Sequence, residues 1–170
     1  MTLVETGLET QTGGRLRRIA KYLGESEDFC MTYGDAVADL DIGAEIAYHR
    51  AHGALATVAA VRPLARFGAL HIEADKVTRF EEKPEEESGL ISGGFFVLNR
   101  KVIEYIEGDA TLWEKAPMER LAREGQLRAF RHAGFWQPMD TLRDRLALER
   151  LCEDGAVSYT HLTLPTKRIG

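Results

Sequence analysis

Short apolar runs alternate with amphipathic segments along the chain, a pattern that predicts strands and helices in turn. The segments expected to form strands are TLVET (2–6), DFCMTY (28–33), ALATVAAV (54–61), GGFFVLN (93–99) and QLRAFRH (126–132). FGALHIEA (67–74) and KVTRFEEK (76–83) are predicted to form a hairpin with a turn near Ala74-Asp75. This alternation, with an antiparallel hairpin inserted, predicts an α/β fold with a mixed sheet flanked by helices.

Capping signals place the predicted helices. They cover 16–23, 41–53, 100–107, 117–125 and a last segment from Thr141. TGG at 12–14 is interpreted as a glycine loop before the first helix. The second is expected to start at Asp41 as its cap, to end at Gly53 and to bury Ile42 and Ile46. In the last helix Thr141-x-x-Asp144 resembles a capping box, and one face carries Leu148, Leu151 and Cys152.

Composition narrows the class of protein. With 44% hydrophobic and 29% charged residues, the 170-residue chain has the profile of a soluble globular domain. A net charge of −5 and the lack of a basic block argue against a nucleic-acid surface. No apolar run approaches the roughly 20 residues that span a bilayer, and MTLVETG does not resemble a signal peptide. Cys30 and Cys152 are solitary, so we expect neither disulfide nor zinc site, and a cytoplasmic location.

Two aspartates in similar settings are the leading candidates for chemistry. Asp35 follows Gly34 at the end of a predicted strand, where α/β sheets bind ligands and where glycine lets a ligand approach. Asp140 lies in FWQPMDT, whose aromatic residues 135–136 are expected to limit water. A hard cation such as Mg²⁺ would hold the two carboxylates together. Alternatively, Gly-Asp is an ordinary turn and Asp140 a solvated residue before a helix.

Three further segments offer ligand-binding groups. In FEEKP, Lys83 is suited to neutralise a phosphate and Glu82 to accept hydrogen bonds from sugar hydroxyls, although composition alone favours a solvated hairpin end. Gly93-Gly94 allow close approach of a ligand or form a bulge. TGGR (12–15) provides amides and the Arg15 guanidinium for an anion before a helix.

Six segments together resemble the sugar nucleotidyltransferase family, and within it the cytidylyltransferases that act on glucose 1-phosphate. They are TGGRLRR, TYGDAVADLDI, RFGAL, FEEKP, GGFFVLN and FWQPMDTLRD, in register from about Thr2 to about Gly155. The resemblance implies an incomplete Rossmann-like fold of the glycosyltransferase-A type. It also implies a homo-oligomer that converts CTP and glucose 1-phosphate to CDP-glucose and pyrophosphate with Mg²⁺. Its product would serve lipopolysaccharide O-antigen synthesis.

The same resemblance assigns roles to individual residues. Asp35 and Asp140 would be the magnesium ligands, with Lys83 on the sugar phosphate. The other substrate-binding positions would be Arg15 on phosphate, Gly34 beside the ligand, Glu82 on the glucose hydroxyls, and Ser92 and Gly93 in the glucose site. Ser92 stands where the family usually has asparagine, and Ala36 replaces a glycine.

The domain organisation also departs from the family pattern. Residues 1–157 resemble its later part, whereas the glycine-rich G-G-x-G-T-R loop and the following lysine have no counterpart here. We therefore expect a partial domain, inactive alone and with exposed sheet edges, and a non-native or disordered tail over 158–170. The alternatives are a non-catalytic sugar-phosphate-binding module and a related uridylyl- or thymidylyltransferase.

Overall fold

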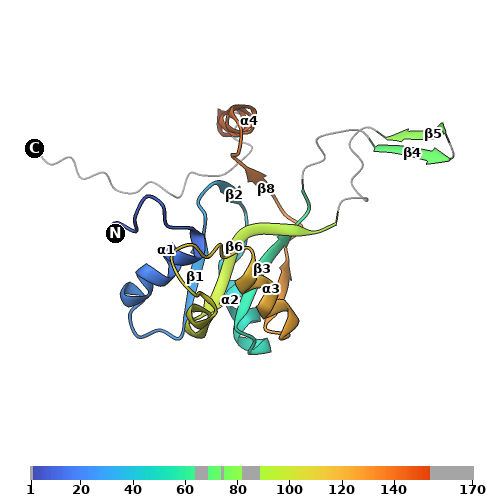
Figure 1. Cartoon of the computed structure of the whole chain (residues 1–170). Helices are drawn as coiled ribbons and strands as arrows, with labels where there is room; N and C mark the ends of the chain where they lie inside the picture. Colours follow the sequence, from blue (N-terminus) through green and yellow to red (C-terminus); the bar gives the residue numbers. More distant parts are fainter. Residues whose placement is uncertain (1, 64–68, 74, 82–88, 154–170) are drawn as a thin grey trace, which may run out of the picture.

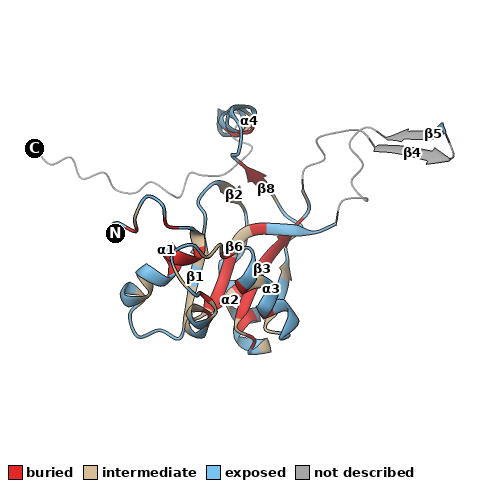
Figure 2. Ribbon diagram, viewed as in Figure 1, coloured by how far each residue is buried: buried red, intermediate tan, exposed pale blue. Residues whose placement is uncertain are grey.

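A four-stranded mixed sheet forms the centre of the computed structural model, which describes residues 2–63, 69–73, 75–81 and 89–153. Its strands lie in the order β1 (Asp28–Thr32), β6 (Ile91–Asn99), β3 (Ala56–Val61) and β7 (Leu127–Arg131) (Figure 1). β1 and β3 run antiparallel to β6, and β7 runs parallel to β3. Every residue of β3 is buried, as the apolar run 54–61 predicts (Figure 2). The mixed sheet flanked by helices is therefore confirmed.

One face of the sheet carries the hydrophobic core. The elements that cover it are α1 (Thr12–Ile19), the 3₁₀ helix η2 (Arg100–Tyr105) and α3 (Ala116–Arg123). The buried core side chains are Leu16, Ala56, Val58, Phe96, Leu98, Val102, Ile106, Trp113 and Leu121. Fully burying a side chain such as Leu98 contributes about 1.5–3 kcal/mol to the free energy of unfolding. Packing of α1, η2 and α3 on the sheet therefore stabilises the fold.

Helix α2 (Ile42–His52) packs on the opposite face of the sheet. The Thr57 hydroxyl of β3 is hydrogen-bonded to His49 of α2. Successive side chains of a strand point to opposite faces, so Thr57 points away from the core residues Ala56 and Val58. The predicted ends are confirmed: Asp41 accepts a hydrogen bond from the Ala44 amide, and Gly53 has φ +66°. The predicted apolar face is wrong. Ile42 is exposed, and the buried positions are Glu45 and His49.

A directional hydrogen-bond network fixes the histidines beneath α2. The Ala54 amide donates to His52 Nδ1 at 2.9 Å, so the ring proton is on Nε2, 2.8 Å from Thr57 Oγ1. The Thr57 hydroxyl accepts that bond and donates its own proton to His49 Nδ1 at 2.8 Å. Burial lowers the pKa of both histidines, which keeps the network neutral.

Three smaller elements complete the described chain. β2 (Ala36–Ala38) and β8 (Trp136–Pro138) form a two-stranded antiparallel ribbon that the sequence did not predict. β4 (Ala69–Glu73) and β5 (Lys76–Glu81) form the predicted hairpin. α4 (Leu142–Glu153) begins with the predicted capping box, in which Asp144 Oδ2 accepts from the Thr141 amide at 3.1 Å. Within the described residues, no helix is both long and apolar enough to cross a membrane.

Three predicted elements need correction. Residues 2–6 form no strand; this segment is held by side chains instead, as where Arg18 donates to the Thr6 carbonyl. TGG at 12–14 is the first turn of α1, which continues into the short 3₁₀ helix η1 (Ala20–Tyr22). The segment 100–107 is helical as predicted only over Arg100–Tyr105, where it forms a 3₁₀ helix. The predicted tail at 158–170 lies outside the described residues.

The two glycines of α1 serve close packing, and this gives a stability prediction. A Cβ on Gly14 would stand 2.6 Å from the Asp109 Cα, a rigid backbone atom. We expect Gly14→Ala to lower the free energy of unfolding by about 2–3 kcal/mol, because either α1 or the loop that contains Asp109 must shift to make room for the added Cβ. Urea denaturation measures it. Gly108→Ala is the control because its Cβ meets no atom within 4 Å; equal stability of the two variants would contradict the packing role.

Candidate functional site

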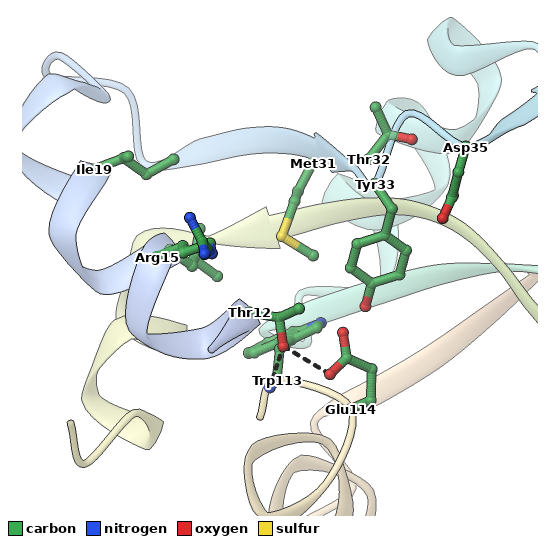
Figure 3. Close-up of a pocket in the computed structure, with 10 residues that line it drawn as sticks. Thr12, Arg15, Ile19, Met31, Thr32, Tyr33, Asp35, Trp113 and Glu114 are labelled. Carbon is green, nitrogen blue, oxygen red and sulfur yellow. Dashed lines mark hydrogen bonds between the residues drawn. The ribbon is translucent and has the colours of Figure 1, made fainter. Parts of the chain in front are cut away.

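A hollow of about 570 Å³ lies between α1, the end of β1 and the segment before α3 (Figure 3). Its walls are Thr12, Arg15, Leu16, Ile19, Met31, Thr32, Tyr33, Asp35, Trp113 and Glu114. Two residues predicted from separate motifs, Arg15 and Asp35, therefore line the same cavity. This volume is in the range of small-molecule sites.

Arg15 is held in its position by the segment before α1. Its guanidinium donates to Thr6 Oγ1 at 2.7 Å and to the Leu8 carbonyl at 3.2 Å. The predicted contribution of backbone amides to an anion site is wrong. The Gly13 and Gly14 amides donate to the Thr111 carbonyl at 3.0 and 3.2 Å, so they are already used in packing. Binding of an anion here would depend on the Arg15 side chain.

A polar cluster on the hollow's wall was not predicted from the sequence. The Thr12 hydroxyl donates to Glu114 Oε2 at 2.7 Å and accepts from the Trp113 amide at 3.0 Å. The Tyr33 hydroxyl points toward the Glu114 carboxylate (Figure 3). Burial, followed by the hydrogen bond and charge of Glu114, raises the pKa of Tyr33 above its ordinary value. Tyr33 is therefore a protonated donor and Glu114 an acceptor.

The β2–β8 ribbon brings the segments of the two candidate aspartates together. Ala36 lies opposite Pro138, and the Met139 amide donates to the Asp35 carbonyl at 2.7 Å. Asp35 and Asp140 thus stand at the same end of one ribbon although far apart in sequence. Asp140 is exposed to solvent, so the expectation that aromatic residues limit water around it is wrong.

This end of the ribbon suits a hard cation. Both carboxylates offer oxygen, the ligand that Mg²⁺ prefers, and both are accessible. Among the residues that the structure describes, no group of three or more His, Cys, Asp or Glu side chains could hold a metal ion. Magnesium commonly takes only one or two protein carboxylates and completes its shell with water and phosphate. A metal shared by Asp35 and Asp140 fits this donor set and stays a prediction.

Gly93 belongs to a bulge that connects the sheet to the ribbon. Between Val58 opposite Phe96 and Ala60 opposite Ser92, β6 contains extra residues, which confirms the bulge interpretation. The Gly93 carbonyl accepts a hydrogen bond from Trp136 Nε1 at 2.9 Å. A Cβ on Gly93 would stand 2.8 Å from Val61 Cγ1.

The remaining predicted substrate residues differ in accessibility. Gly34 has φ +81° and open space where a Cβ would stand. Ser92 is exposed, and its hydroxyl accepts from the Gly94 amide at 3.4 Å. Glu82 and Lys83 lie outside the described residues.

Comparison with known proteins defines the class. Residues 3–137 match the family model described as nucleotidyl transferase, and the chain belongs to this family. Its fold agrees with that of solved nucleotidyltransferases. It matches a putative glucose-1-phosphate thymidylyltransferase from Bacillus anthracis with a TM-score of 0.63, 20% identity and coverage of 87% of this chain and 63% of that one. HddC from Yersinia pseudotuberculosis matches with a TM-score of 0.64, 24% identity and coverage of 90% and 65%.

Curated proteins with similar sequences include glucose-1-phosphate cytidylyltransferases. The chain is 56% identical over 159 residues to a glucose-1-phosphate cytidylyltransferase from Salmonella typhi, covering 94% of this chain and 62% of that protein. A probable glucose-1-phosphate cytidylyltransferase from Bacillus subtilis (strain 168) is 38% identical over 156 residues, with coverage of 91% and 61%. The chain thus spans about three-fifths of these curated relatives.

Proposed function

We propose that this chain is the sugar-phosphate portion of an enzyme that transfers a cytidylyl group from CTP to glucose 1-phosphate. The observation that carries the proposal is the 56% identity to a protein named for this reaction. Two features of the chain support it. One is the hollow that Arg15 and Asp35 line, and the other is the ribbon end beyond which both Asp35 and Asp140 lie.

The reaction suits the groups available. An oxygen of the glucose 1-phosphate phosphate forms a bond to the α-phosphorus of CTP, and the bond from that phosphorus to the bridging oxygen breaks. Pyrophosphate leaves with the electron pair. The nucleophile is already anionic near neutral pH, so no general base is required, and positioning and charge neutralisation dominate. Bound Mg²⁺ would neutralise phosphate charge.

Each residue then has a defined task. Asp35 and Asp140 would hold the metal ion from the ribbon end. Lys83 would bind the sugar phosphate, and Glu82 would accept hydrogen bonds from glucose hydroxyls. Arg15, fixed by Thr6 and Leu8, would bind phosphate in the hollow. Gly34, Ser92 and Gly93 would line the sugar side.

A turnover assay tests the proposal. The part of the Salmonella typhi relative that this chain does not cover is joined to the chain, which gives what we term the completed enzyme. Pyrophosphate release with glucose 1-phosphate and Mg²⁺ is measured with CTP, UTP and dTTP. Because the joined part supplies the glycine-rich loop, the assay tests the sugar-phosphate portion of this chain. We expect pyrophosphate release with CTP that depends on glucose 1-phosphate, with UTP and dTTP as the comparison. Binding of glucose 1-phosphate without turnover would reject the proposal and favour a non-catalytic module.

The cellular setting forms part of the same proposal. The enzyme would act in the cytoplasm, where CTP is available, and would be a homo-oligomer. Its product would supply O-antigen synthesis. Sedimentation of the completed enzyme tests the oligomer; a monomer at all concentrations would contradict it.

Lys83 provides a prediction for substrate binding. We expect Lys83→Ala to weaken glucose 1-phosphate binding by about tenfold or more, because a charge-assisted hydrogen bond to phosphate contributes about 1.5–3 kcal/mol. Calorimetric titration in the presence of Mg²⁺ measures the affinity. Lys101→Ala, which removes an exposed lysine of η2, is the matched control. Equal affinity of the Lys83 and Lys101 variants would remove Lys83 from the site.

A further inference from the structure

The Trp136 indole joins the ribbon to the main sheet. Trp136 belongs to β8, and its Nε1 donates to the Gly93 carbonyl of the β6 bulge at 2.9 Å. The fit is close: a Cβ on Gly93 would stand 3.4 Å from that nitrogen. The bulge turns the Gly93 carbonyl toward the ribbon, and Gly94 in it has φ +78°.

The ribbon needs such an anchor because it is small. Only three residue pairs join β2 and β8, and a two-stranded ribbon of this size is not stable in isolation. At the end away from the candidate aspartates, His132 Nε2 lies 3.0 Å from Asp39 Oδ1 and 3.1 Å from the Phe135 carbonyl. Trp136 follows this corner and binds across to the sheet, before the chain reaches Asp140.

We propose that Trp136 is a positioning residue for the metal and sugar-phosphate site. Its N–H bond to Gly93 ties the ribbon to the bulge Ser92–Gly94 at the pair Ala38–Trp136, two pairs before the ribbon end that carries Asp35 and Asp140, and so restricts where that end can lie. The carboxylates of Asp35 and Asp140 and the backbone of the bulge Ser92–Gly94 would then keep a fixed relative position around a ligand that both contact. This inference rests on the proposed function, because it concerns the geometry of the same site.

The hydrogen bond is removed by Trp136→Phe, which keeps an aromatic ring. Mn²⁺ serves as the probe, followed by water proton relaxation, with and without glucose 1-phosphate. We expect the dissociation constant for Mn²⁺ to rise about tenfold, the consequence of losing one positioning hydrogen bond. We also expect the amide resonances of Met139 and Gly94 to shift. Tyr105→Phe, which removes a hydroxyl donor to Glu124 far from the ribbon, is the matched control and should leave both readouts unchanged.

The outcomes separate the two proposals. If the wild-type chain binds Mn²⁺ and Trp136→Phe binds it equally tightly, the positioning role is overturned and the proposed function stands. If the wild-type chain binds neither Mn²⁺ nor glucose 1-phosphate, the proposed function fails and the positioning role fails with it. If Trp136→Phe does not fold, the NMR spectrum of the wild-type chain tests the positioning role instead. The Trp136 indole resonance must shift when Mg²⁺ and glucose 1-phosphate are added, and an unchanged resonance rejects the inference.

Discussion

Asp140→Asn is expected to lower the rate of cytidylyl transfer by about 100-fold or more in the completed enzyme, the scale of losing a group that stabilises transition-state charge. The substitution keeps the size of the side chain and removes its negative charge, so it weakens metal binding specifically. Asp140 is exposed and lies beyond the last pair of the β2–β8 ladder, so the fold should persist. Pyrophosphate release measures the rate, and circular dichroism checks the fold.

Asp41→Asn is the matched control for this substitution. It makes the same chemical change at the cap of α2, where asparagine also accepts the hydrogen bond from the Ala44 amide. The control should keep near-wild-type turnover. Near-normal turnover in Asp140→Asn would show instead that Asp140 only precedes a helix, the alternative that the sequence left open.

The elements predicted correctly from the sequence are those with strong local signals. The run 54–61 is uniformly apolar and becomes the fully buried β3, while Asp41 and Gly53 mark both ends of α2. The β2–β8 ribbon was missed because three-residue strands have no detectable periodicity. Residues 2–6 have a composition typical of a strand. A strand also needs a neighbouring strand to pair with, and in the described part of the chain residues 2–6 pair with none.

The candidate site was predicted only in part, for a related reason. Arg15 and Asp35 come from recognisable motifs, and the fold places both in one hollow. Glu114 and Thr12 meet across about a hundred positions of sequence, and neither belongs to a motif that indicates the other. Their pairing is a property of the fold, since α1 packs beside the segment before α3.

The buried face of α2 shows most clearly how a local pattern misleads. Ile42 and Ile46 have helical spacing, yet Glu45 and His49, with the same spacing of four, point inward. Glu45 is only 1% exposed, and its Oε1 has no hydrogen-bond partner among the described residues. Burial raises the pKa of Glu45 from 4.5 to about 7. An ionised carboxylate in this position is therefore costly.

The pH dependence of stability follows from this shift. Below pH 4.5 Glu45 is protonated in both the folded and the unfolded chain, so it has no effect. As the pH rises toward 7, the unfolded chain releases the proton first, and the free energy of unfolding falls. Above that pH the full cost applies, which is about 3 kcal/mol. The lowered pKa values of His49 and His52 act in the opposite sense, because their stabilisation is lost as the pH falls below 6.5.

Glu45→Gln isolates the contribution of the carboxylate, because the two histidines are retained. We expect the variant to gain about 2 kcal/mol relative to the wild-type chain between pH 5 and pH 8, since glutamine has no proton to release. Urea denaturation at both pH values, followed by tryptophan fluorescence, measures the difference. Glu104→Gln, at an exposed position of η2, should show no such change. A pH-independent difference for Glu45→Gln would mean that Glu45 is ionised in the folded chain and has a partner that offsets its burial.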